Sequence, residues 1–277
     1  MKGFANLDAP KDKQKGITAE FLIDLQEKVK GGRDATRHAA NLIEGGYFFA
    51  MRGGEFAWTR VPLKTKRICL RDVTFRDDKR RVVPHNDPRL SESATRVTIC
   101  FRDQKNGEKN ERRTQKATNE VLCPVKAWIR IVNFVWNNVW NASPDTPVAT
   151  VRASATGSGQ EVTLDATVKL MKSMCKLMAP VKNYGFEDHE LGARSIRTGA
   201  AMALFMVHKD PLRVMILGRW KSMAFMEYIR PQVLELTDDL ATAMTFVQPM
   251  TDLAEREPLP TRQTKRTKQS FRPFQFY

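Results

Sequence analysis

The spacing of apolar residues changes twice along this chain, and these changes limit the folds that it can adopt. Residues 17–30 and 34–51 carry apolar side chains at the spacing of a helix. Residues 68–75 and 95–101 are instead rich in β-branched and apolar residues with partial alternation, which predicts strands. Helical spacing returns at Pro124, a residue that suits a first helical turn. The sequence therefore predicts an α+β fold, mainly α-helical, with a small antiparallel β-sheet.

A turn signal follows the second predicted strand. The dipeptide Asn106-Gly107 is typical of a tight hairpin turn, because both residues tolerate a positive φ. It predicts a β-hairpin at this point. The stretch 77–94, which contains Pro84 and Pro88, is expected to be a loop or insertion between the strands.

The second half of the chain is expected to be helical. Apolar spacing predicts helices at 163–178, from about Arg194, at 211–217 and at 233–247. Asp210-Pro211 supplies an N-cap and a first-turn proline for the helix at 211–217, and Gly218 ends it.

The composition along the chain predicts one main domain with two less ordered ends. Residues 1–16 carry charge, proline and glycine without periodicity, which indicates a flexible arm. Residues 17–250 hold all the predicted elements. Residues 251–277 end in a basic stretch that we expect to be disordered.

The charge balance favours a polyanionic partner. Forty-six Lys and Arg stand against 31 Asp and Glu, which gives a formal net charge of +15 and a pI near 9.8. Basic side chains that neutralise phosphates release condensed counterions, so such an excess favours nucleic acid. Acidic membranes attract the same charge, and composition alone leaves both partners open.

Neither metal binding nor membrane insertion is indicated. The four cysteines and four histidines are scattered without the spacing of a zinc site, and we expect no metal or other cofactor. Cysteines used this way fit reduced core residues of an intracellular protein. The most apolar stretch, AWIRIVNFVWNNVW, is interrupted by Arg130 and is too short to span a bilayer.

Motifs near residue 200 carry a resemblance to a known family. Arg194 and Arg197 stand three positions apart before a run of small residues, and Gly218-Arg219 follows downstream. Tyr228 stands nine positions beyond Arg219. This pattern resembles the C-terminal signature of the tyrosine recombinases, the phage integrase family. The phrase GRWKSMAFMEYIR looks most like recombinases of eukaryotic mobile elements of the Crypton and DIRS-like groups.

Upstream residues fit the same resemblance. In the family, a helix delivers a first catalytic arginine in an arginine–small–x–glutamate context, and AMRGGEF matches it with Arg52 and its supporting acid Glu55. The family also carries a catalytic lysine in the following hairpin. Lys105 is the first candidate for it, and Lys109 is the second.

The resemblance implies a reaction that suits these residue types. Tyr228 would attack a DNA phosphodiester and form a 3′-phosphotyrosyl intermediate, while Lys105 protonates the departing 5′-oxygen. Arg52 and Arg197 would hold the non-bridging oxygens, because guanidinium groups stay protonated and bind phosphate bidentately. Arg194 is expected to face the same side of its helix as Arg197. The reaction needs no metal, cofactor or small-molecule substrate.

Two residues depart from the family pattern and keep a second hypothesis open. Arg194 stands where the family has His, and Arg219 where it has His or Trp. Arginine binds phosphate but is a poor general base. The alternative to an active recombinase is therefore a catalytically inactive DNA-binding remnant or a domesticated recombinase domain.

The resemblance also implies the partners and the setting. Double-stranded DNA is the expected partner, on which the family acts as a homotetramer that commonly exchanges a C-terminal helix between subunits. We expect an intracellular protein, nuclear if the host is a eukaryote, that serves DNA integration or site-specific recombination. Most relatives also have an N-terminal DNA-clamp domain, and only about 16 residues precede the first expected helix here, which fits an excised domain, a truncated gene or a minimal recombinase.

Overall fold

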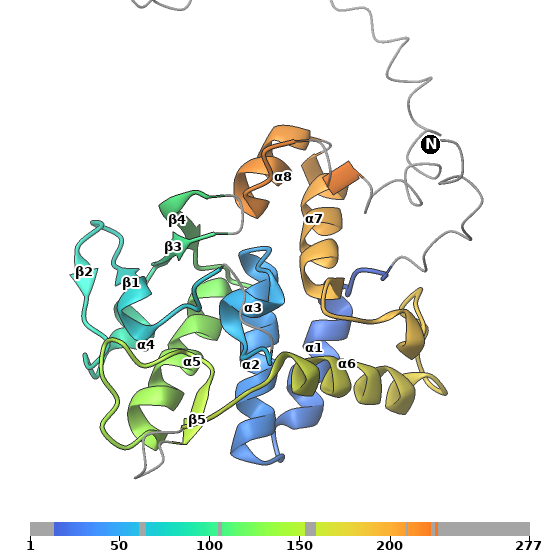
Figure 1. The fold of residues 1–277 in the computed structure, drawn as a ribbon, viewed down its shortest axis with the longest axis horizontal. Coiled ribbons are helices and arrows are strands. Elements are labelled where there is room, and N and C mark those ends of the chain that lie inside the picture. The colour runs from blue at the N-terminus through green and yellow to red at the C-terminus, as the bar shows by residue number, and fades with distance from the viewer. Residues whose placement is uncertain are drawn as a thin grey trace, which may run out of the picture. The chain divides into compact units, whose positions relative to one another are not determined.

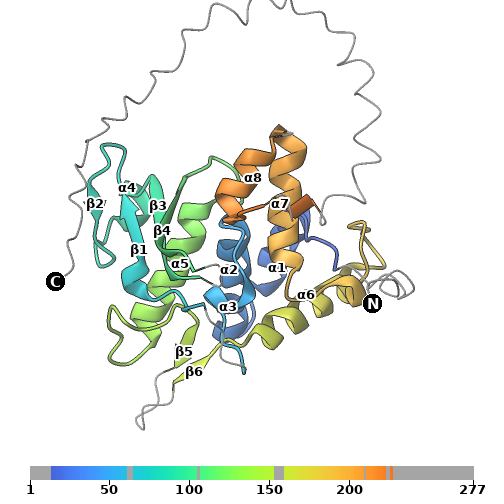
Figure 2. The same ribbon diagram turned by 45° about the horizontal axis from the view of Figure 1, so that its top comes forward.

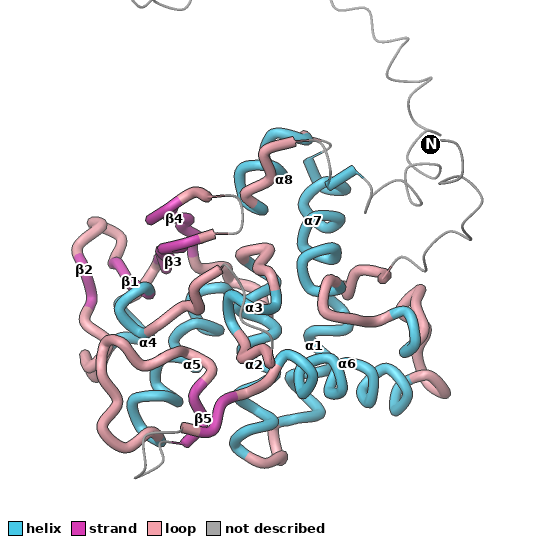
Figure 3. Tube along the Cα trace, in the orientation of Figure 1, coloured by secondary structure: helices cyan, strands magenta, loops and turns pink. Residues whose placement is uncertain are grey.

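In a computed structural model, the structure describes residues 14–60, 65–104, 107–152, 159–208, 210–222 and 225–226. The helix predicted at 233–247 and the tail at 251–277 lie outside the described residues. Within the described part, the α-helices are α1 (Ala19–Val29), α2 (Asp34–Phe48), α3 (Gly53–Phe56), α4 (Leu90–Ser93), α5 (Pro124–Asn138), α6 (Leu164–Met178), α7 (Ser195–His208) and α8 (Pro211–Gly218). Figure 1 shows their arrangement, and Figure 3 separates helices from strands by colour.

An antiparallel sheet lies on one side of the helices. Its strands follow the order β2-β1-β3-β4, formed by β2 (Val82–Val83), β1 (Val73–Arg76), β3 (Arg96–Asp103) and β4 (Lys109–Lys116). The β3–β4 hairpin predicted from Asn106-Gly107 is confirmed, and Gly107 has the positive φ, 82°, that such a turn requires. A separate two-stranded ribbon consists of β5 (Thr150–Arg152) and β6 (Gln160–Glu161). The fold is thus mainly helical with a small antiparallel sheet, as predicted.

Helix α2 forms the centre of the described domain. It packs against α1, α5, α6 and α7, and Figures 1 and 2 show the sheet on the opposite side of α2 from α7. Gly45 and Gly46 allow this packing: a Cβ at Gly45 would lie 2.8 Å from Cδ1 of Ile131, and one at Gly46 would lie 3.1 Å from the ring of Phe56. These glycines therefore mark close packing, not a helix end.

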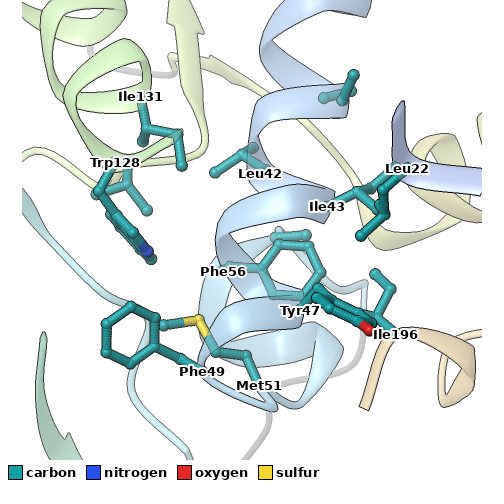
Figure 4. Close-up of a cluster of buried hydrophobic side chains, with 14 of the residues drawn as sticks. Leu22, Leu42, Ile43, Tyr47, Phe49, Met51, Phe56, Trp128, Ile131 and Ile196 are labelled. Atoms are coloured by element: carbon teal, nitrogen blue, oxygen red, sulfur yellow. The ribbon is translucent and has the colours of Figure 1, made fainter. Parts of the chain in front are cut away.

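The core gathers large side chains around α2. Figure 4 shows Trp128 and Ile131 of α5 facing Leu42, with Leu22 of α1 near Ile43. All of these side chains are buried. Their heptad-like spacing in the sequence is the signal that predicted helices here, because a helix must bury its apolar stripe.

The end of the predicted arm belongs to the domain. The side chain of Gln14 accepts a hydrogen bond from the backbone N–H of Arg194 at 2.8 Å, and the backbone N–H of Lys15 donates to Glu190 at 3.0 Å. A Cβ at Gly199 would lie only 2.0 Å from the carbonyl oxygen of Ile17, so the backbones of this segment and α7 touch. The domain therefore starts no later than residue 14, whereas the sequence placed the boundary at 17.

Two stretches differ from the sequence prediction. The strand predicted at 68–75 begins only at Val73, because Leu70–Asp72 form a 3₁₀ turn in which Asp72 accepts a hydrogen bond from the backbone of Cys69. The loop predicted at 77–94 contains the short strand β2 and the one-turn helix α4. Short elements of this kind carry too little periodicity to be predicted.

The buried His38 makes stability depend on pH. Its ring stacks on Phe134 at 4.0 Å between centroids, and its Nε2 lies 2.8 Å from the carbonyl oxygen of Val148. Burial lowers the pKa of His38 to about 4, whereas an unfolded histidine has a pKa of about 6.5. Between these values the unfolded state binds the proton and the folded state does not.

We therefore predict that the free energy of unfolding falls as the pH is lowered from about 6.5 to about 4, by at most about 3 kcal/mol from this residue. Urea unfolding across this range measures the loss, and His38→Gln, which keeps an N–H donor without a titratable ring, serves as the comparison. Equal pH dependence in both proteins would contradict the assignment.

Candidate active site

Arg219, one of the predicted site residues, is buried at the end of α8. It is the C-cap residue and adopts the left-handed conformation with φ 58°, which costs a non-glycine residue roughly 1–2 kcal/mol. Its guanidinium lies 3.6 Å from the ring centroid of Phe101. It donates three hydrogen bonds: from Nε to Gln104 Oε1 at 3.0 Å, from Nη1 to the carbonyl of Phe49 at 3.0 Å and from Nη2 to Glu55 Oε2 at 2.6 Å.

Glu55 is the carboxylate that joins two arginines. Its side chain is fully buried, and Oε1 lies 3.0 Å from Nη1 of Arg52, while Oε2 accepts from Arg219 and from the backbone N–H of Arg52 at 2.8 Å. Burial lowers the pKa of Arg219 to about 10; the charge of Glu55 opposes this shift and that of Arg52 adds to it. Arg219 is therefore protonated at neutral pH, and one carboxylate is shared by two cations.

Arg197 joins the same group from α7. It is 7% exposed, its Nη2 donates to the carbonyl oxygen of Gly218, and its guanidinium lies 4.0 Å from the ring centroid of Trp220. A Cβ at Gly218 would lie 1.5 Å from the Trp220 ring, so only glycine lets this ring fold back onto α8. Through Gly218 and Glu55, Arg197 is connected to Arg219 and Arg52.

These contacts leave an excess of positive charge. The guanidinium groups of Arg52 and Arg219 share one buried carboxylate, and the nearby Glu111 is paired with Arg113. The side chain of Arg52 is 27% exposed, whereas that of Arg219 has no exposed surface. Arg52 is therefore the cation of this cluster that offers a donor to an anion from solvent.

The β3–β4 hairpin is tied to the cluster through Gln104. Gln104 is 2% exposed; its Oε1 accepts from Arg219, and its Nε2 donates to Glu111 at 2.5 Å. It directly precedes Lys105, the first candidate for the general acid, which lies outside the described residues. Lys109, the second candidate, is exposed and stands opposite Asp103 at the start of β4.

Two other predicted site residues are not part of the cluster as described. Arg194 is exposed and directly precedes the first residue of α7, and its carbonyl accepts a hydrogen bond from the backbone N–H of Thr198 at 2.9 Å. Tyr228 lies outside the described residues. Phe225, three positions before Tyr228, is described and fully buried. Its ring centroid lies 5.8 Å from that of Trp220.

The described part of the chain offers neither a metal site nor a membrane span. No three of its His, Cys, Asp and Glu side chains form a group that could hold a metal ion. None of its helices combines the length and the apolar character needed to cross a membrane.

The comparisons with known proteins give only a similarity to solved structures. No family model and no curated protein matches the chain. It is similar to the XerH site-specific recombinase bound to difH substrate, with 15% identity and a TM-score of 0.48 over 80% of this chain and 52% of that one. It is also similar to the Tn1549 transposon integrase in complex with transposon right end DNA, with 10% identity and a TM-score of 0.45 over 85% and 69% of the two chains.

The chain thus spans about half the length of the XerH chain. At these identities and TM-scores the likeness is limited to the general fold, and what the chain does has to be read from its own residues.

We predict that Arg219→Gln lowers the free energy of unfolding by about 3 kcal/mol or more, because it leaves Glu55 buried without one of its cations. Arg213→Gln, on the same helix with a side chain 60% exposed, should cost far less. Urea unfolding of both variants makes the comparison.

The double variant Glu55→Gln/Arg219→Gln should lose less stability than the two single changes added together. Additive losses would mean that the ion pair does not hold this region together.

Proposed function

We propose that this chain is the strand-exchange domain of a tyrosine recombinase, which cleaves and rejoins DNA in integration or site-specific recombination. The observation that carries the proposal is the convergence of Arg52, Arg197 and Arg219, which are up to 167 positions apart in the sequence. Arg219 also binds Gln104 of the hairpin, the residue that directly precedes Lys105. Arg52 and Arg219 share the buried carboxylate of Glu55, and Arg197 holds the backbone next to Arg219 through the carbonyl of Gly218, which unrelated arginines have no reason to do.

In the proposed reaction, the Tyr228 phenol attacks the phosphorus of a DNA phosphodiester. The new Oη–P bond forms as the P–O5′ bond breaks, the phenol proton goes to solvent, and Lys105 gives a proton to the departing 5′-oxygen. The positive cluster stabilises the charge that grows on the non-bridging oxygens. Because one phosphoester replaces another, the step is reversible without ATP, and a second DNA end can reverse it.

The residues of the cluster divide between contact and support. Arg52 has the exposed surface to meet a phosphate, and Arg197 is held against Trp220 and the carbonyl of Gly218. Arg219 donates its hydrogen bonds to Gln104, the carbonyl of Phe49 and Glu55. We assign it a positioning role, which differs from the general base or acid that a histidine would provide.

A second function is favoured by one observation. Arg219 has no exposed side-chain surface and Arg194 lies outside the cluster, so the two positions where the family uses His or Trp contribute no proton-transfer group. A chain that only binds DNA would tolerate both changes. Strand exchange, in contrast, requires a covalent protein–DNA adduct and more than one copy on the DNA.

The adduct is the first test. Duplexes enriched by binding from a randomised library are rebuilt as nicked suicide substrates, which trap the intermediate because the short cleaved strand diffuses away. We expect a denaturant-resistant adduct that Tyr228→Phe abolishes and that Tyr47→Phe, at a buried tyrosine of α2, leaves intact. Arg52→Ala should slow adduct formation by roughly 10²–10³-fold.

Two outcomes would decide against catalysis by this residue. Binding without any adduct would favour the DNA-binding alternative. An adduct that survives Tyr228→Phe would place the nucleophile at another residue.

The choice between Lys105 and Lys109 can be made with a substrate whose 5′-bridging oxygen is replaced by sulfur. A thiol has a pKa of about 8.5, so a thiolate leaves without being protonated, and the general acid becomes dispensable. We predict that Lys105→Ala cleaves the sulfur substrate but not the oxygen substrate, and that Lys109→Ala cleaves both. The opposite pattern would assign the role to Lys109.

A further inference from the structure

The outward face of the four-stranded sheet carries a row of cations in direct register. Arg76 of β1 is paired with Arg96 of β3, and Arg96 with Lys116 of β4. Neighbouring strands lie about 4.8 Å apart, so the three side chains start within roughly 10 Å of one another. Like charges placed directly opposite each other destabilise a sheet.

The sheet does not neutralise this row. Within the described part of the chain, none of the three residues is in an ion pair, and the guanidinium groups of Arg76 and Arg96 donate to backbone carbonyls and a hydroxyl. Nη1 of Arg76 donates to the carbonyl of Arg80 at 2.9 Å, and Nη1 of Arg96 donates to the carbonyl of Asp77 at 3.0 Å. These hydrogen bonds fix the orientation of the two guanidinium groups but do not neutralise their positive charges.

The same face continues with hydroxyl groups and further arginines. Thr74, Thr98 and Thr114 form the next row, and the Oγ1 atoms of Thr98 and Thr114 lie 2.8 Å apart. A hollow of about 470 Å³ on this face is lined by Thr74 and Thr98 and by four arginines, Arg71, Arg76, Arg102 and Arg112.

One carboxylate lines this hollow, and it is already neutralised. Asp72 has a side chain 1% exposed and forms an ion pair with Arg102. Arg71, at the rim, pairs with Asp145. The outward face therefore keeps a clear excess of positive charge beside a row of hydroxyl donors.

We propose that this cationic sheet face, formed by residues 74, 76, 96, 98, 100, 102, 110, 112, 114 and 116, binds the phosphate backbone of duplex DNA away from the cleaved phosphate. Charge complementarity supports this occupant: arginine, lysine, threonine and asparagine are the side chains that contact phosphates without reading bases. The face lacks the aromatic and aliphatic side chains that form the centre of most protein–protein interfaces. The inference rests on the proposed function for the position of the reacting phosphate.

The hairpin relates this face to the active site. Strand β3 runs from Arg96 to Asp103 and then reaches the turn that bears Lys105. Seven residue steps of about 3.4 Å put the Arg76–Arg96–Lys116 row roughly 24 Å from the turn. That distance corresponds to roughly seven base-pair steps, so DNA that follows the hairpin meets the row about two-thirds of a helical turn from the cleaved bond.

The test compares a triple variant with a control of equal charge. Arg76→Gln/Arg96→Gln/Lys116→Gln removes the row, and Lys28→Gln/Arg33→Gln/Lys169→Gln removes three exposed cations from other helices and their ends. Binding is measured as a function of salt on a hairpin-capped duplex that ends roughly 4 base pairs beyond the cleavage site, short of the row, and on one that continues for roughly 30 base pairs.

We expect the triple variant to bind the long duplex more weakly, with a slope of log Kobs against log salt that is smaller by roughly 2–3, and to bind the short duplex like the original protein. Its free energy of unfolding should be unchanged or higher, because like charges have been separated. A loss of affinity together with a gain in stability cannot come from misfolding.

Three outcomes would overturn the inference: equal effects on both duplexes, a loss no larger than that of the control, or unchanged DNA binding, which would mean that an acidic protein segment occupies the face. Failure of the proposed function looks different. In that case the original protein forms no adduct on suicide DNA, yet its binding still depends on duplex length and on the sheet row.

Discussion

The ion pair between Arg219 and Glu55 is the interaction on which the rest of this structure depends. It joins the end of α8 to the start of α3, and the same guanidinium reaches the hairpin through Gln104. Both side chains are removed from water, so each charge is stable only while the other is present. The strained left-handed backbone of Arg219 persists because these contacts outweigh it.

This pair also determines where the remaining cations lie. Glu55 holds Arg52 with its other oxygen, and the backbone next to Arg219 holds Arg197 through the carbonyl of Gly218. A change at Arg219 would therefore reach two guanidinium groups that it does not touch. Arg219 holds Gln104, Phe49 and Glu55 in place with three hydrogen bonds. A neutral histidine has two ring nitrogens and no fixed charge, so it would make fewer of these contacts.

Sequence patterns predicted the helices and the hairpin because long apolar periods and the Asn106-Gly107 turn are local signals. The family resemblance, not a local pattern, implied that Glu55 supports Arg52, and the two side chains are paired. Sequence patterns could not predict that Arg219 is buried, because its three partners come from distant segments. Strand β4, with the sequence KNERRTQK, has no apolar alternation, and only its pairing with β3 shows which of its side chains point outward. Sequence patterns also could not predict that Arg194 is exposed while Arg197 is buried, because Arg194 directly precedes the first residue of the helix.

Both cationic regions of this protein meet in the β3–β4 hairpin. Its tip is anchored by Gln104 to the buried arginine cluster, and its outward face carries Arg96 and Lys116. Neither region is favourable for the protein alone: the cluster holds more cations than carboxylates, and the row sets like charges side by side. A polyanion laid along the hairpin would relieve both at once. Under the proposed function, these unfavourable charges form one side of an interface whose other side is a phosphate backbone.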